Sequence, residues 1–289
     1  MFLFNKMNEI AQRFSEVSYL LDFIDGFTLL IMVFVIMGIA YDLIRKRPRN
    51  YKEVSANIAI GMGNGLLNIT FYGLILIVTL WFTEQIALTK IPVNIWTWVI
   101  AIIVADFSYY WMHRVEHKVR FFWTIHSVHH SSTEFDLTTA LRLAWLEGLI
   151  EWIFFVPMVL IGFDMVQAIV SIIIVVAYQT WIHTKHIGKL GWLDKLFNTP
   201  SVHRVHHGSN PQYIDKNFGG ILMIWDKMFG SYQAEEQSVV FGLTKNIGTS
   251  NPLTINFYEW ITLFKDLQST KKFNEKWAYL INPPGWTQK

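Results

Sequence analysis

Three long apolar stretches dominate this chain: residues 26–41, 56–82 and 91–111. Asp106 is the only charged side chain within them. A helix of about 20 apolar residues crosses the hydrocarbon core of a bilayer, where every backbone polar group has to be hydrogen-bonded within the protein. The sequence therefore predicts an all-α integral membrane protein, a helical bundle with about three spans. The second stretch is long enough to contain a kink, which we expect at its glycines or at Asn64 or Asn68.

The composition fits a membrane protein with a substantial polar part. Of its 289 residues 52% are hydrophobic, yet 24 lysines and arginines stand beside 22 aspartates and glutamates. The net charge of +2 is too small to indicate a nucleic-acid partner. The absence of cysteine excludes disulfides, iron–sulfur clusters and cysteine-based zinc sites.

A run of basic residues after the first apolar stretch sets the predicted topology, because such runs mark the cytoplasmic end of a span. It consists of Arg45, Lys46, Arg47, Arg49 and Lys52. The third span then returns to the cytoplasm just before His113. Two further apolar runs, 145–161 and 165–182, predict a helical hairpin. Its first arm is shortened by Glu147 and Glu151, so the hairpin either crosses the bilayer or only dips into it.

Both ends of the chain carry amphipathic patterns. Near the N-terminus apolar residues at helical spacing fit a helix on the membrane surface and an ordinary helix with one solvated face equally well; they are Ile10, Phe14, Val17 and Leu21. A similar pattern near the C-terminus predicts a helix that packs on the membrane surface or, as we favour, on the protein core. It comprises Leu253, Phe257, Trp260, Ile261 and Phe264.

All ten histidines lie in four tight groups within one window of the sequence. The groups are HRVEH (His113, His117), HSVHH (His126, His129, His130), HTKH (His183, His186) and HRVHH (His203, His206, His207). Residues three and four apart share one face of a helix, so the groups present patches of imidazole. The predicted topology gathers all of them on the cytoplasmic side, in a histidine-rich cap.

Metal coordination explains these patches better than ten separately buried imidazoles, because neutral imidazoles bind metals together. One four-coordinate ion needs about four ligands, so this number of histidines predicts two ions close together, as in two-metal catalytic sites. Imidazole ligation suits iron, zinc and copper alike, and spacing alone leaves the metal open. No glutamate is followed three residues later by histidine, and HExxH is absent.

The groups HRVEH, HSVHH and HRVHH reproduce the HxxxH, HxxHH, HxxHH pattern of the membrane fatty acid hydroxylase/sterol desaturase superfamily, which the chain resembles over residues 91–232. The resemblance implies a di-iron, O2-dependent enzyme that hydroxylates or desaturates an unactivated C–H bond of a lipid. It implies His183 and His186 as further ligands beside the main set. That catalytic and metal-binding set comprises His113, His117, His126, His129, His130, His203, His206 and His207.

Within the superfamily the chain is most similar to the alkylglycerol monooxygenase branch. The similarity rests on HHSS (129–132), TALR (139–142), NTPSVHRVHHGSNPQYIDKNFGG (198–220) and IWDKMFGSY (224–232). Lys118 stands where that branch commonly has glutamate, and Leu143 and Ala144 stand where it has glutamine and serine. These departures count against a tetrahydropterin cofactor and against ether-lipid substrates.

Polar residues near the histidines fall into three sets. Asp215, Lys216, Asn217 and Asp226 are candidates either to orient the ligating histidines or to cap loops. Glu147 and Glu151 either line the site or, as we favour, mark the membrane interface. Arg142 and Arg204 are candidates to bind a lipid phosphate.

We expect a single membrane-bound domain, with N-terminal helices in 1–90, the histidine-motif catalytic core in 91–232 and a C-terminal cytoplasmic segment in 233–289. The expected activity is hydroxylation of a lipid alkyl or acyl chain with O2 and two iron ions, which zinc can replace during purification. No haem or nucleotide motif is visible, so electrons are expected from a separate donor. The alternatives are a sterol or lipid desaturase of the same superfamily and a membrane di-zinc hydrolase.

Overall fold

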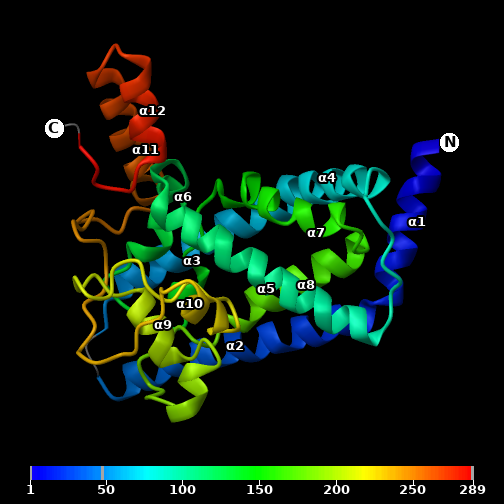
Figure 1. Cartoon of the computed structure of the whole chain (residues 1–289). Helices are drawn as coiled ribbons and strands as arrows, with labels where there is room; N and C mark the ends of the chain where they lie inside the picture. Colours follow the sequence, from blue (N-terminus) through cyan, green and yellow to red (C-terminus); the bar gives the residue numbers. More distant parts are fainter. Residues whose placement is uncertain (1, 47–48, 288–289) are drawn as a thin grey trace.

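A computed structural model describes residues 2–46 and 49–287 of the chain (Figure 1). The described residues form helices and loops without a β-strand; Phe197–Leu222 and Gly208–Phe241 form isolated bridges. The helices are α1 (Phe2–Glu16), α2 (Ser18–Ile44), α3 (Tyr51–Leu67), α4 (Gly73–Gln85), α5 (Ile95–Lys118), α6 (Arg120–His130), α7 (Val156–Leu160), α8 (Met165–Tyr178), α9 (Pro200–His206), α10 (Ile224–Met228), α11 (Pro252–Ser269) and α12 (Phe273–Ile281). The prediction of an all-α protein is confirmed.

Three helical segments of the described chain are long and apolar enough to cross a membrane: Ser18–Ile44, Tyr51–Gln85 and Ile95–Lys118. They coincide with the three predicted spans. Many of their large apolar side chains point outward, as lipid-facing side chains do; Ile69, for example, is 88% exposed. Of the basic residues that follow the first span, Arg47 lies outside the described residues.

The second span is interrupted where the sequence predicts a kink. Between α3 and α4 the segment Asn68–Tyr72 is π-helical, and such segments are rare and often lie at functional sites. The Asn64 amide donates to the carbonyl of Ala144 at 2.7 Å, and the Asn68 amide donates to the Asn64 side chain at 2.8 Å. The irregular turn thus ties the span to the segment that follows residue 144.

The predicted hairpin exists, but its first arm is not one helix. Short 3-10 turns, Glu147–Leu149 and Glu151–Phe154, precede the five residues of α7. The second arm, α8, has 14 residues, which gives it a length of about 21 Å, less than the roughly 30 Å of a hydrocarbon core. By this length, α8 alone is too short to cross the bilayer. It packs along α5 through a buried core that includes Ala105 and Val170.

The amphipathic N-terminal helix packs on protein. Ile10, Phe14 and Val17 contact the core built by α5, α7 and α8. The Arg13 guanidinium donates to Glu84 at 2.8 Å and to Asp164 at 2.5 Å. These contacts fasten α1 across the end of the bundle that lies opposite α9 and α10 (Figure 1).

The C-terminal helix α11 packs on α6 and α3, and α12 packs on α11 and α6. The predicted helix is confirmed, and of the predicted core-facing residues Trp260 and Phe257 pack on the protein but the other three do not. Ile255 and Leu263 are buried, whereas Leu253, Ile261 and Phe264 are exposed. In Figure 1 the α11–α12 pair extends away from the rest of the protein beside α6.

Candidate metal centre

Nine of the ten histidines meet at one end of the spans. His113 and His117 lie one turn apart at the end of α5. The next helix, α6, carries His126, His129 and His130 on its last two turns. His183 follows α8, α9 contributes His203 and His206, and His207 comes directly after α9. Because α5 and α6 are joined by Val119 alone, the first two sequence groups face each other directly.

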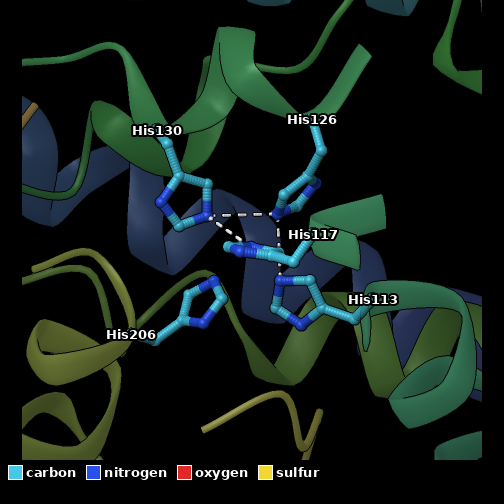
Figure 2. A group of neighbouring side chains, drawn as sticks. All are labelled: His113, His117, His126, His130 and His206. Atoms are coloured by element: carbon cyan, nitrogen blue, oxygen red, sulfur yellow. Dashed lines mark hydrogen bonds between the residues drawn. The ribbon is translucent and has the colours of Figure 1, made fainter. Parts of the chain in front are cut away.

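The rings divide into two adjacent groups, in each of which one nitrogen from every ring lies within 4.8 Å of the others. The five-histidine group is His113, His117, His126, His130 and His206, and Figure 2 shows its rings converging from α5, α6 and α9. The four-histidine group is His129, His183, His203 and His207. The stacked rings of His130 and His207, with centroids 4.4 Å apart, join the two groups.

His186 belongs to neither group. Its side chain is exposed, and its backbone N–H donates to the Thr184 hydroxyl at 3.1 Å. The structure therefore does not bring His186, expected as a further ligand, together with the other nine histidines. The chain bends away from the site directly after His183, which the short spacing in HTKH does not reveal.

Four of the rings are oriented by backbone carbonyls that lie beside their Nδ1 atoms. The Nδ1 of His113 lies 2.9 Å from the carbonyl of Phe218, and that of His206 lies 3.0 Å from the carbonyl of Lys216. The Nδ1 atoms of His129 and His183 lie 3.3 and 2.8 Å from the carbonyls of Arg142 and Gln179. A carbonyl accepts only a protonated nitrogen, so in each ring Nε2 presents a lone pair to the centre.

These lone pairs face one another at short range. Nε2 of His183 lies 3.2 Å from that of His129 and 2.9 Å from that of His203. In the five-histidine group Nε2 of His126 lies 2.9 Å from that of His113 and 3.2 Å from that of His130. Ligands on one ion with metal–nitrogen bonds of about 2.0–2.1 Å are separated by about 2.9–3.4 Å. The spacing therefore fits neighbouring ligands of a metal ion.

The electrostatics of the histidines agree with this fit. Burial lowers the pKa of His129 to about 4 and lowers the pKa of His203 and His207 well below the ordinary value. The rings are therefore neutral at physiological pH, the form that binds metals. The buried Nε2 of His206 has no hydrogen-bond partner, as expected for an atom whose partner is a metal ion. Each group can thus hold one ion.

Two carboxylates lie behind the rings of the five-histidine group. Asp215 lies 3.5 Å from Nδ1 of His117 and 2.5 Å from the Lys118 ammonium. Burial opposes the ionisation of Asp215, but these two contacts outweigh it and hold its pKa below the ordinary value. Oε2 of Glu116 lies 3.2 Å from Nδ1 of His126 but makes no hydrogen bond with it. Asp215 therefore has the position of a carboxylate that fixes the orientation of a ligating imidazole.

Of the polar residues in the loop after the third histidine group, some contact the histidine rings and others hold the loop in place. Asp215 and the backbone of Lys216 contact ligating rings, whereas Asn217 and Asp226 hold the loop itself. The Asn217 amide donates to the carbonyls of Val202 and Gln233. Asp226 accepts the backbone N–H groups of Phe218 and Gly219, both at 2.8 Å. The loop that carries the Phe218 carbonyl is therefore fixed from behind.

Asp106, the one charged residue of the apolar stretch 91–111, also fixes this loop. Its carboxylate accepts the backbone N–H groups of Ile221 and Leu222 and the indole N–H of Trp225. Gly220 packs so closely on Asp106 that a Cβ atom there would lie 2.8 Å from the carboxylate oxygen. The span and the third histidine group are thus locked together.

Two cavities adjoin the centre and are lined by different histidines. The outer cavity, of about 150 Å³, is lined by His117, His130 and His206 together with Ser209, Asp215, Thr244 and Pro283. The inner cavity, of about 100 Å³, is lined by His126, His129 and His183 together with Glu116, Glu147 and Glu151. Glu147 and Glu151 therefore line the site, which was the alternative to their expected place at the membrane interface.

A third space, the bundle cavity, shares the walls of the inner cavity. It has about 290 Å³ and is lined by Asn68, Tyr72 and Leu76 of the interrupted span and by Ile172 and Phe155. Leu143, Glu147, Glu151 and Val176 line both spaces. The two cavities, separated by this shared wall, lie between the four-histidine group and the π-helical part of a membrane span.

Neither arginine proposed for a lipid phosphate is available for one. Arg142 is almost fully buried and donates to Glu53 at 2.7 Å and to Asn57 at 2.9 Å. Arg204 donates to Glu235 at 2.7 Å and to the carbonyl of Ile187 at 2.7 Å. Both side chains hold the protein around the site together.

Sequence reasoning passed over Glu116, although it stands inside the HRVEH motif next to His117. It also passed over Trp123, which lines the outer cavity and whose ring centroid lies 5.2 Å from that of His117. Glu116 could not be identified as a site residue from its local sequence, because His126, beside which it lies, belongs to the next helix.

Comparison with known proteins points to one family. Residues 98–231 match the profile described as Fatty acid hydroxylase. The alkylglycerol monooxygenase of Homo sapiens is 38% identical over 242 residues, which cover 83% of this chain and 54% of that protein. The Xenopus tropicalis alkylglycerol monooxygenase is 34% identical over 275 residues, covering 94% of this chain and 61% of its own length.

A more distant relative, the ornithine lipid hydroxylase OlsE of Rhizobium tropici, is 27% identical over 140 residues, which cover 46% of this chain and 41% of the relative. No solved structure matches the chain. The chain thus spans little more than half the length of the alkylglycerol monooxygenases named above. The matched segment contains every histidine of both groups, and residues 98–231 of this chain form a domain of the fatty acid hydroxylase family.

Proposed function

We propose that this protein is a membrane-bound lipid monooxygenase that uses O2 to hydroxylate an alkyl or acyl chain. The observation that carries the proposal is the position of the two histidine groups. They lie between a cavity that runs toward a membrane span and a cavity walled by extramembrane loops. A lipid chain and a water-soluble co-reactant can approach such a centre from different sides.

The nine grouped histidines would hold two iron ions, with five imidazoles around one ion and four around the other. When bound, such a pair of ions supplies the activation of O2 and the oxidation of an aliphatic C–H bond. The protein holds the imidazoles neutral by burial and aims their Nε2 atoms by the backbone carbonyls behind them. Their orientation is set before metal binds, because the carbonyls belong to helix ends and fixed loops.

The inner and bundle cavities would take the lipid chain. Their apolar wall is formed by residues such as Leu143, Val176 and Leu76. This wall excludes water from the reacting carbon, while the spanning helix supplies a lateral route from the bilayer. The alkylglycerol monooxygenases and the lipid hydroxylase among the relatives make a lipid with a long alkyl chain the expected substrate class.

Hydroxylation requires two electrons and two protons besides O2, since one oxygen atom enters the C–H bond and the other leaves as water. A separate electron donor would supply the electrons through the outer cavity, which brings Ser209, Asp215 and Thr244 to the metal-facing rings. Lys118 is held by Asp215 at this cavity. A lysine in the place of the branch's glutamate argues against tetrahydropterin as the donor.

The proposed orientation places the histidine groups in the cytoplasm. Arg45, Lys46 and Arg49 follow α2 and precede α3, and basic residues are retained on the cytoplasmic side. The end of α5 that carries His113 and His117 lies on that same side, because α3 and α4 together cross the bilayer once and α5 crosses back.

The test is oxygen labelling in expressing cells. Cells that produce the protein are grown under ¹⁸O-labelled O2, and their lipids are compared by mass spectrometry with those of cells producing His206→Ala. A labelled hydroxyl, or a labelled aldehyde if the oxidised carbon carries an ether oxygen, is expected only with the intact histidine group. A new double bond without label would indicate the desaturase, and label arriving only from water would indicate the hydrolase.

His186→Ala is the matched control for this experiment. Its imidazole lies in the same sequence motif as His183 but outside both groups. We expect it to give the same labelled lipid as the unchanged protein.

A further inference from the structure

An apolar stripe runs along the outside of the α11–α12 pair. On α11 it includes Leu253, Ile261 and Phe264, which are 60%, 53% and 62% exposed. On α12 it continues with Phe273 and Trp277, which are 81% and 54% exposed. The spacing of eight and three residues on α11 and of four residues on α12 places these side chains on one face of each helix. The opposite face of α11 already packs on the protein through Ile255 and Leu263.

The stripe is continuous with the surface of a membrane span. Phe257 of α11 packs its ring 6.3 Å from that of Trp145. Trp145 lies directly on α3, where its indole N–H donates to the carbonyl of Ile60 at 3.1 Å. A Cβ atom at Gly63 would collide with this indole. The apolar side of α11 therefore meets the spanning helix with no polar segment between them.

The chemistry of the stripe fits the boundary region of a bilayer. Aromatic side chains that combine a large apolar body with one polar atom concentrate at that depth, and the exposed Trp277 of α12 is such a residue. Exposed lysines flank the stripe at Lys265 and Lys271. An amphipathic helix with aromatic and lysine residues of this kind lies in the interface with its apolar face among the lipid chains.

We propose that the α11–α12 pair binds the surface of the bilayer in which the protein is embedded, with the stripe inserted beside α3. A lipid surface is favoured over a protein partner because the stripe lies on a helix that packs, through Phe257 and Trp145, on the apolar helix α3, which is long enough to span a membrane. Insertion of the exposed side chains also removes a large apolar surface from water, which is favourable at roughly 25 cal/mol per Å².

This binding reaches the candidate metal centre through the segment after α12. The backbone N–H of Arg120, at the start of the histidine helix α6, donates to the carbonyl of Asn282 at 3.1 Å. The Arg120 side chain pairs with Asp266 of α11 and lies over the ring of Tyr279. Pro283 and Pro284 then line the outer cavity. Membrane binding by the pair therefore holds one wall of that cavity.

The test measures the depth of single side chains in the full-length protein. The chain contains no cysteine, so Phe264→Cys and Phe273→Cys each accept one environment-sensitive fluorophore. Ser269→Cys and Lys271→Cys are the matched controls, because both residues are exposed and lie off the stripe. Each labelled protein is placed in phosphatidylcholine nanodiscs, with nitroxide on the lipid chains as one quencher and iodide in the water as the other.

We expect the lipid nitroxide to quench the labels at 264 and 273 about threefold or more above the control labels, and iodide to show the reverse order, since an inserted stripe lies among the acyl chains. Equal quenching by iodide at all four positions would overturn the proposal. Labels at 264 and 273 that are shielded from both quenchers would overturn it as well, because a second copy or another protein would then cover the stripe.

The introduction of two negative charges into the stripe supplies a second test. In Phe264→Asp/Phe273→Asp we expect the nitroxide quenching of a label at Trp277→Cys to fall to the level of the controls. Unchanged quenching would contradict insertion through this stripe. Both readings are independent of lipid turnover, so they distinguish a failure of this proposal from a failure of the proposed enzymatic function.

Discussion

Nε2 of His129 lies 3.2 Å from Nε2 of His183, although both rings turn their Nδ1 atoms toward backbone carbonyls. Two lone pairs at this distance repel each other unless a cation lies between them. The four-histidine group therefore has a geometry that a metal ion stabilises. The same arrangement makes the protein sensitive to acid, because protonated imidazoles cannot be accommodated there.

Acid is expected to destabilise the metal-free protein between pH 7 and pH 5. The pKa of His129 is about 4 in the folded protein and near 6.5 when unfolded, so the unfolded state binds more protons in this range. Stability then falls as pH falls. At pH 5 this group alone lowers the free energy of unfolding by about 2 kcal/mol.

The measurement is thermal unfolding of the chelator-treated protein in detergent at pH 7, 6 and 5. His186→Ala should show the same pH dependence as the unchanged chain, because this exposed histidine lies outside both groups. A melting temperature that stays constant from pH 7 to pH 5 would show that the grouped imidazoles are not held neutral by burial.

Substitution of Arg142 is expected to destabilise the fold rather than weaken lipid binding. In Arg142→Met the Glu53 carboxylate loses its buried partner, which costs about 3–5 kcal/mol. The backbone carbonyl of residue 142, which orients His129, is expected to shift as well. Lys185→Met removes an exposed pair with Glu134 and should change stability by about 1 kcal/mol or less.

The apparent melting temperature in detergent, measured beside metal content, checks this prediction. Should Arg142→Met retain the stability of the unchanged protein while only the KM for lipid rises, then Arg142 binds a head group and its assignment to the fold is incorrect.

Filling the passage to the bilayer is expected to slow lipid turnover without removing metal. Val176 lines both the inner and the bundle cavities. A tryptophan at this position would block the passage, and we expect Val176→Trp to lower kcat/KM about tenfold or more, which corresponds to at least about 1.4 kcal/mol. Ile161→Trp, at an exposed position outside the cavities, is the control.

Turnover is measured with the lipid identified by oxygen labelling, and iron is measured on the same samples. Unimpaired turnover by Val176→Trp with full metal content would mean that the lipid reaches the metals by another route.

The orientation of the protein can be tested with one cysteine in this cysteine-free chain. Ser209 follows the third histidine group and lines the outer cavity. We expect Ser209→Cys to react with an impermeant maleimide only after cells are opened, because the histidine groups share the side of the Arg45–Arg49 segment. Labelling in intact cells would place the groups outside. Ser127 is unsuitable, since its side chain is buried.

The spans and most of the histidine set could be predicted because their signals are local. Uncharged runs and histidines three or four residues apart appear directly in the sequence and fix helices and helix faces. The π-helical turn at Asn68 also fell where polar residues interrupt an apolar run.

The remaining features depend on residues that are distant in the sequence. Arg142 meets Glu53 across 89 residues, and nothing in the TALR motif announces that partner. Glu147 and Glu151 looked like interface residues because a helical arm was expected, whereas 3-10 turns carry them into the inner cavity. The apolar face of α11 was assigned to the core because periodicity identifies a face but not what covers it.

The metal content of the purified protein tests the central claim most directly. After anaerobic reconstitution with iron and removal of excess, elemental analysis should find about two irons per chain, because the two groups supply five and four imidazoles. His206→Ala should lower the content while the protein still inserts into membranes, and His186→Ala should leave it unchanged. One iron or fewer per chain in the unchanged protein, or equal loss in both variants, would contradict a two-metal centre built by these nine histidines.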